Sequence, residues 1–181
     1  VQEGLADENL PLVGQWNGHW LNALVQLFYK RNYEQALEEA KITVGIVPND
    51  SETLAHVALV AIYAGDSDLA LEWINRAISR EPHVPGWYYL HRGLAYHRKG
   101  NCDRAFQEFE KVPWPAYDKE AASATCYVER GQLDKAQAEL AELHDNHPGF
   151  TTASLRLRLP YKDNEFSEQY FATLAKAGLQ K

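Results

Sequence analysis

The sequence predicts an all-α fold, a solenoid of antiparallel helix hairpins stacked one after another. The main observation is internal repetition: Ala36 and Ala70 are 34 residues apart, and Pro48 and Pro82 are also 34 residues apart. Apolar residues on both sides of Gly65 recur every three to four residues, which is the helical period. A composition of 45% hydrophobic and 24% charged residues in 181 residues suits one compact domain.

The repetition predicts four units, each of two helices. We expect these units at 17–50, 51–84, 85–116 and 117–148, with helix pairs at 15–31 and 33–46, 51–64 and 67–80, 85–99 and 102–112, and 117–130 and 133–146. Four hairpins therefore fill residues 15–148. Residues 1–14 are expected to be a linker or the remnant of a preceding repeat, and residues 149–181 an atypical fifth hairpin with a capping helix.

Residues that stop helices stand at the expected helix ends. Gly65, Gly100 and Gly131 lie where the first helices of three units end, and glycine adopts the left-handed conformation that closes a helix. Pro48 and Pro82 follow second helices, which proline cannot continue because it lacks the backbone donor. The hairpin boundaries therefore follow from local chemistry as well as from the repetition.

These positions resemble the tetratricopeptide repeat family, whose unit of about 34 residues carries bulky, small, aromatic, glycine, alanine and proline residues at fixed offsets. The matching residues are Trp20, Ala36 and Pro48 in the first unit, Gly65, Ala70, Ala77 and Pro82 in the second, Tyr89, Gly93, Tyr96, Gly100, Ala105 and Phe109 in the third, and Tyr127, Gly131, Ala136 and Pro148 in the fourth. The resemblance implies a right-handed alpha-alpha superhelix. The small residues Ala36, Ala70, Ala105 and Ala136 are expected where the two helices of a hairpin cross closely.

Two segments depart from the repeat. Pro113 and Pro115 flank Trp114 in a shortened third unit, whose second helix we expect to end early. Three leucines from Leu155 to Leu159 alternate with arginines, which fits a strand, but Leu155 and Leu159 also share a helix face. We favour the helix, and we expect the apolar face of the next segment, 164–178, to close the end of the solenoid.

The C-terminal region carries a second, more restricted resemblance. The segments 147–150, 158–160 and 176–179 resemble the ends of tetratricopeptide regions attached to bacterial class III adenylate cyclases and related signalling regulators. This resemblance implies an output domain upstream of Val1. The sequence contains no metal-binding aspartate pair or nucleotide-binding loop of a cyclase, so we expect it to be non-enzymatic. Because it begins at Val1 and lacks methionine, we interpret it as a piece of a longer protein of this kind.

Charge and composition narrow the classes of partner. The net charge of −7 gives no basic field for nucleic acid, and no apolar stretch approaches the roughly 20 residues of a membrane-spanning helix. The two cysteines are too few for a disulfide framework, and we interpret Cys126 as a small core residue. We therefore expect a reduced, cytoplasmic location and no membrane insertion of this segment, although the parent protein could be attached to a membrane.

The partner we expect is a protein or peptide, bound by the concave surface that the first helices line. The family's inward-facing offsets supply the candidate groove residues Asn22, Tyr29, Glu52, His56, Tyr63, Trp87, His91, Leu94 and Arg98. Aromatic and arginine side chains are common anchors of protein interfaces. Core packing is the competing interpretation for Trp87, and a homodimer through the groove or the bend at Trp114 remains open.

Other functions have weaker support in the sequence. No HExxH motif, P-loop or serine triad context is present, and His91 and His97 are six residues apart, which does not suit one shared helix face. We therefore expect no catalytic residue, no metal and no cofactor. The alternative to an arm of a signalling protein is a free-standing adaptor or co-chaperone that carries a client protein.

Overall fold

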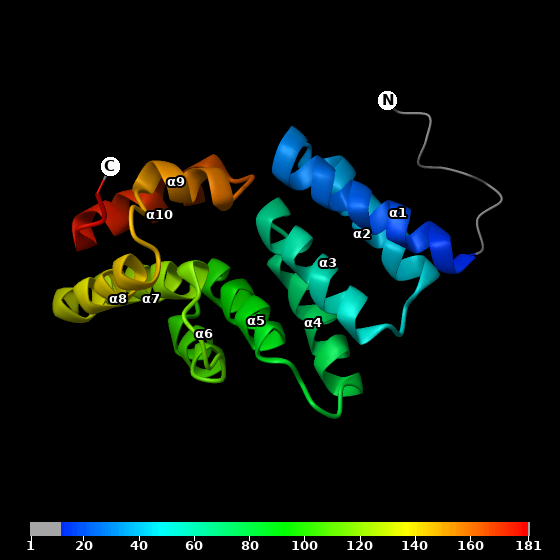
Figure 1. Cartoon of the computed structure of the whole chain (residues 1–181), viewed down its shortest axis with the longest axis horizontal. Helices are drawn as coiled ribbons and strands as arrows, with labels where there is room; N and C mark the ends of the chain where they lie inside the picture. Colours follow the sequence, from blue (N-terminus) through cyan, green and yellow to red (C-terminus); the bar gives the residue numbers. More distant parts are fainter. Residues whose placement is uncertain (1–11, 181) are drawn as a thin grey trace.

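Ten α-helices and one short π-helix follow one another along residues 12–180, which are the residues that the computed structural model describes (Figure 1). The helices are α1 (Leu12–Val25), η1 (Gln26–Lys30), α2 (Tyr33–Ile46), α3 (Ser51–Ala64), α4 (Ser67–Arg80), α5 (Gly86–Arg98), α6 (Cys102–Phe109), α7 (Tyr117–Glu129), α8 (Leu133–Asn146), α9 (Thr152–Arg158) and α10 (Asn164–Ala177). The linker expected over 1–14 lies outside the described residues except for 12–14, which belong to α1.

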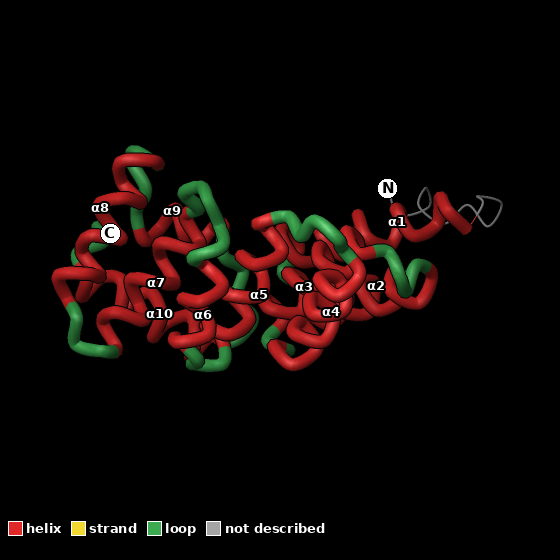
Figure 2. The backbone as a smooth tube through the Cα atoms, turned by 90° about the horizontal axis from the view of Figure 1, so that it is seen from below, coloured by secondary structure: helices red, strands yellow, loops and turns green. Residues whose placement is uncertain are grey.

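The helices pack in pairs and form two layers, as Figures 1 and 2 show. Each first helix packs on its partner, in the pairs α1 with α2, α3 with α4, α5 with α6, and α7 with α8. The first helices α1, α3, α5 and α7 also contact one another in order, whereas each of the second helices α2, α4 and α6 contacts the first helix of the following pair. The predicted all-α solenoid is confirmed, and its first helices form an inner surface.

Local chemistry sets the helix ends. Asp50, Asp66 and Asn101 precede α3, α4 and α6, and each side chain accepts a hydrogen bond from a backbone N–H of the following first turn. Gly65 ends α3 with a φ of 91°, in the left-handed region that favours glycine. The expected helix 15–31 differs from the structure, because α1 ends at Val25 and the chain continues as the π-helix η1.

Small residues allow the helices of a pair to approach closely. The four repeat alanines, Ala36, Ala70, Ala105 and Ala136, are fully buried. At Gly93 on α5, an added Cβ would lie 2.4 Å from Cε1 of Phe109 on α6, closer than real side chains approach. The third pair therefore depends on the absence of a side chain at position 93, and α6 ends at Phe109, earlier than the expected residue 112.

The C-terminal region is helical and covers one end of the solenoid. Residues 152–158 form α9, so the helix favoured from the sequence is confirmed over the alternative strand. The last helix, α10, packs against α7 and α8 and also against α9, and it buries Tyr170, Phe171 and Leu174. Its apolar face thus closes the core beyond the fourth pair.

A disulfide between Cys102 and Cys126 joins the start of α6 to α7. The expectation of two reduced cysteines is therefore wrong for this structure. The sequence gives no spacing motif for this pair, because the two residues are 24 positions apart and are brought together only when the third and fourth pairs stack. The bond links the shortened α6 directly to the helix that follows the proline-rich bend.

Candidate functional site

An aromatic ladder crosses the inner surface from the first pair to the third. We use this name for Trp20 on α1, His56 on α3 and Trp87 on α5. The ring centroids of Trp20 and His56 are 5.4 Å apart, and the rings of His56 and Trp87 stack at 4.5 Å with an angle of 28° between their planes. All three side chains are half-buried. The ladder therefore keeps aromatic surface accessible where three successive units meet.

The histidines near the ladder are held uncharged. His91 is buried on α5, its Nδ1 lies 2.9 Å from the carbonyl oxygen of Ala55, and its ring is 5.3 Å from that of Trp87. Burial lowers the pKa of His91 to about 4 and also lowers the pKa of the half-buried His56. At neutral pH the ladder thus offers neutral, stacking rings to a ligand.

The chain's own C-terminal region covers another part of the inner surface. Tyr161, in the loop between α9 and α10, packs its ring 5.2 Å from that of Tyr63 at the end of α3. Arg98 at the end of α5 donates to the Asp163 carboxylate at 3.1 Å, and its guanidinium lies 3.8 Å from the Phe166 ring centroid. Two candidate groove residues, Tyr63 and Arg98, are therefore covered by the chain's own C-terminal region.

The remaining candidate residues are not gathered at one place. Asn22 donates to Glu39 of α2 at 2.9 Å and so takes part in a contact within the first pair. Tyr29 on η1 is 86% exposed, and Glu52 is also exposed. Leu94 is only 2% exposed. Of the nine candidates, the structure brings His56, Trp87 and His91 together, and it places Tyr63 and Arg98 around the C-terminal loop.

Sequence reasoning missed two residues that shape this surface. Trp20 occupies a repeat position that the family offsets do not assign to the groove, yet its indole ring is the first ring of the ladder. Tyr161 lies in a segment treated as a cap, and no periodic signal marks it. An aromatic residue directly after Pro160, a proline that disfavours continuation of the preceding helix, is the one local signal that could have drawn attention to it.

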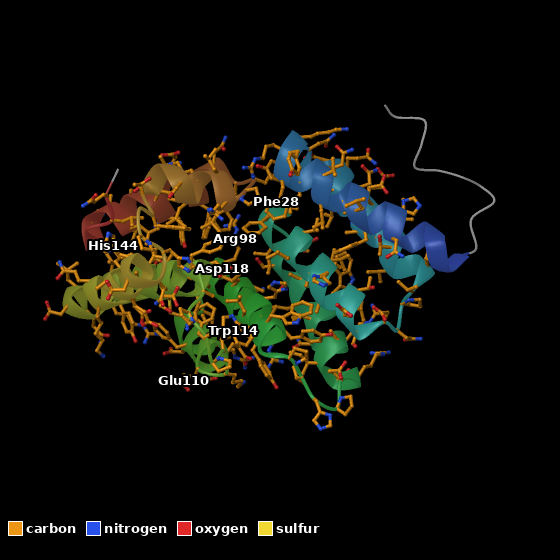
Figure 3. All side chains as sticks on the ribbon, viewed as in Figure 1. Phe28, Arg98, Glu110, Trp114, Asp118 and His144 are labelled. Atoms are coloured by element: carbon orange, nitrogen blue, oxygen red, sulfur yellow. A yellow bond between two sulfur atoms is a disulfide. The ribbon has the colours of Figure 1, made fainter. Side chains whose placement is uncertain are left out.

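A carboxylate and several phenols meet where the C-terminal region covers the inner surface. Asp118, in the first turn of α7, influences Tyr63, Tyr161 and Tyr170 electrostatically, and Figure 3 shows it in the same central region as Arg98. Burial raises the pKa of Asp118 to about 6, and burial with nearby negative charge raises the pKa of each phenol. The raised pKa values thus favour the uncharged forms of these four groups where the C-terminal region covers the inner surface.

Replacing Asp118 by asparagine is expected to remove a pH-dependent loss of stability. The pKa of Asp118 is raised from 3.8 to about 6, so the folded chain holds this proton more tightly than the unfolded chain does. The free energy of unfolding of the wild type therefore falls as pH rises from 4 to 6, by about 1–3 kcal/mol from this group. Urea unfolding of both proteins across this range measures the difference, and parallel curves would contradict the assignment.

The described residues carry no evident metal centre. Within 12–180, no three histidine, cysteine, aspartate or glutamate side chains gather closely enough to hold an ion. Over the same range, no helix combines the length and apolar character that crossing a bilayer requires. The chemistry that the inner surface offers is stacking, apolar contact and a few charged hydrogen bonds.

A comparison with protein families bears on the fourth pair. A family model of the tetratricopeptide repeat matches residues 122–149, which include most of α7, all of α8 and the turn that follows. This match supports a tetratricopeptide repeat in the fourth pair, and such repeats are generally non-catalytic and typically bind proteins or peptides. None of the curated proteins matches the chain. The resemblance of the C-terminal region to cyclase-associated regions stays a prediction.

Proposed function

We propose that this chain is a non-catalytic protein-interaction module that binds an extended segment of a partner protein on its inner surface. The observation that carries this proposal is the aromatic ladder. The ring of His56 is tilted against that of Trp20 and stacks on that of Trp87, so the three rings make contact across three units, yet their side chains are only partly buried. A row of rings that is ordered before binding provides contact area at a small cost in conformational entropy.

The remaining candidate residues define the extent of the proposed surface. Glu52 lies one helical turn before His56, with 3.7 Å between its Oε1 and the imidazole Nε2, and both side chains are accessible. We also include Tyr29 of the first pair in the proposed surface, because its side chain is exposed. A partner segment that crosses the ladder would therefore meet neutral rings and one carboxylate, a combination that suits an apolar or aromatic segment with a basic residue.

The larger setting is also part of the proposal. The resemblance of the C-terminal region favours the C-terminal tetratricopeptide region of a bacterial signalling protein such as an adenylate cyclase, in which this chain would be a scaffold or regulatory arm. The alternative is a free-standing adaptor or co-chaperone with a client in the groove. Reading the gene on both sides of this sequence tests the two settings: a cyclase or regulator domain upstream supports the first, and a start codon directly upstream supports the second.

Two observations favour different cellular compartments for this protein. The composition favours the cytoplasm, as proposed from the sequence. The disulfide between Cys102 and Cys126 favours an oxidising compartment, because structural disulfides are rare in reducing ones. Fractionation of source cells followed by alkylation of free thiols in each fraction decides between them: alkylated cysteines in the soluble cell interior support the cytoplasm, and protected cysteines outside it support export.

Removing two rings of the ladder tests whether the chain binds its partner proteins there. We expect the His56→Ala, Trp87→Ala double variant to retain less than about a tenth of the partner that the wild-type chain captures from source cells, measured by quantitative mass spectrometry, because central aromatic anchors are worth 2 kcal/mol or more. Trp114→Ala is the matched control, since Trp114 is an exposed tryptophan in the bend between α6 and α7.

The controls distinguish a lost surface from a lost fold. Both variants should keep the helical circular dichroism of the wild type, because the ladder residues are only half-buried. A double variant that captures the same proteins as the wild type and the Trp114→Ala chain would contradict the proposal. A double variant that loses its helical signal would show instead that the ladder belongs to the core.

A further inference from the structure

The loop between α9 and α10 lies across the inner surface as a bound peptide would. In Figure 1 this loop reaches from α9 toward the end of α3, far from it in sequence. The backbone N–H of Lys162 donates to the carbonyl oxygen of Tyr63 at 2.9 Å. Two carbonyl oxygens of the region accept hydrogen bonds in turn, that of Tyr161 from the Tyr33 hydroxyl and that of Leu157 from the Arg31 guanidinium.

The side chains of this loop add an aromatic anchor and two flanking charges. Residues 159–161 are buried although they belong to no helix, and Tyr161 is only 7% exposed. Its ring contacts Tyr63, Phe166 and Tyr170. Lys162 pairs with Glu34 on α2, and Asp163 pairs with Arg98 on α5. The sequence Leu-Pro-Tyr-Lys-Asp thus meets a receptor surface made by α2, α3 and α5.

A small number of residues hold this loop against the receptor surface. The pair of Lys162 with Glu34 is exposed, and exposed pairs contribute little to stability, whereas the Arg98 side chain in the second pair is only 11% exposed. Among the described helices, α9 packs mainly against α10, and its Arg158 guanidinium also lies 5.8 Å from the Tyr117 ring centroid of α7. The last helix, α10, packs on α7 and α8 as well. A cavity of about 200 Å3 also remains between α5, α7 and α10, lined by His97, Arg98 and Tyr170 among others. Displacing the loop would therefore break the contacts of Tyr161, Lys162 and Asp163, while the packing of α10 on α7 and α8 would remain.

We infer that residues 159–163 are an intramolecular occupant of a peptide-binding site, and that the partner carries an extended segment of the same chemistry. That segment has an apolar residue and proline before an aromatic anchor, followed by a basic and then an acidic residue. Glu34 and Arg98 set its direction, because their opposite charges select the order of the two flanking residues. Binding would displace the loop, so the site is self-inhibited. This inference rests on the proposed function and extends it from the ladder to the adjoining surface.

Loosening the loop in the full chain tests this inference. The probe is a fluorescein-labelled synthetic peptide with the sequence of residues 156–164, RLRLPYKDN, and fluorescence anisotropy measures its binding. We expect Tyr161→Ala to bind the peptide at least tenfold more tightly than the wild type, whose own loop competes at high effective concentration. Leu157→Ala is the matched control, because this side chain is 75% exposed and the loop uses only its carbonyl oxygen.

A second variant keeps the test decisive if Tyr161→Ala does not fold. Lys162→Glu places a carboxylate opposite Glu34 on the exposed side of the contact, so it opposes the loop without removing a buried side chain. We expect it to raise peptide affinity severalfold. In either background, a peptide with alanine in place of its tyrosine should not bind, and Tyr63→Ala in the chain should abolish binding. Equal affinity of the wild type and a folded loop variant would overturn the inference.

Two further measurements distinguish this inference from a homodimer and from the proposed function of the ladder. Sedimentation at several concentrations shows whether Tyr161 drives a dimer; a dimer that the Tyr161→Ala variant loses would assign the site to a second copy and overturn the partner segment. If the peptide fails to bind while capture of partners still depends on Trp87, the inference falls and the proposed function stands. If capture is also independent of Trp87, both fall.

Discussion

Replacing Phe171 by alanine is expected to lower the free energy of unfolding by about 3–5 kcal/mol. Phe171 lies on α10 and is only 2% exposed. Its ring contacts that of Tyr170 at 5.2 Å, and the Arg156 guanidinium lies 4.3 Å from it, so the deletion leaves a cavity at the point where α9, α10 and the fourth pair meet. Urea unfolding followed by circular dichroism measures the change.

The size of this effect tests whether α10 is part of the cooperative fold. Phe171→Leu, which keeps most of the buried volume, should cost clearly less than the alanine variant. Leu157→Ala should change stability by no more than about 0.5 kcal/mol, because the side chain is exposed. A loss of less than about 1 kcal/mol in Phe171→Ala, with an unchanged transition for the rest of the chain, would show that the four pairs are stable without their cap.

Breaking the disulfide is expected to lower the free energy of unfolding by about 3 kcal/mol. The bond joins residues 24 positions apart, and a cross-link across a loop of this length restricts the unfolded chain by about that amount. The effect should be strong here because α6 has only 8 residues and leads into a segment rich in proline. Thermal unfolding with and without dithiothreitol measures it, with a lower melting temperature expected for the reduced protein.

The matched control is the Cys102→Ala, Cys126→Ala double variant. Its melting temperature should lie near that of the reduced wild type and should not respond to dithiothreitol. Small apolar replacements are used because Cys126 is fully buried. Two thiols titrated in the folded, air-oxidised wild type, together with a melting temperature that dithiothreitol does not change, would contradict a disulfide in solution.

Much of the fold could be predicted from the sequence because its signals are local. The spacing of Ala36 and Ala70, the glycines at the ends of first helices and the side-chain caps at Asp50 and Asp66 act within one or two turns of helix. In a repeat protein each unit packs mainly on its neighbours, so such local signals determine most of the architecture. The π-helix after Val25 has no comparable signal, and it was missed.

The candidate site was predictable only in part. The repeat offsets placed His56, Trp87 and His91 on first helices, and the structure brings their rings together. The same offsets placed Asn22 in the groove, but its amide pairs with Glu39 of α2, because a buried carboxylate requires hydrogen-bond donors. Periodicity identifies the face of a helix, but it does not show which polar partner lies across from that face.

The sequence by itself determined the helices, their pairing and the surface formed by the first helices. Only the tertiary structure decided that the two cysteines meet and that the chain occupies part of its own inner surface. The contact between Arg31 and Leu157 spans 126 positions. Such contacts depend on how far the stacked pairs curve before α10 closes the end, and this curvature sums small contributions from every interface. No local pattern encodes that sum, so the covering of Tyr63 by Tyr161 appears only in the folded chain.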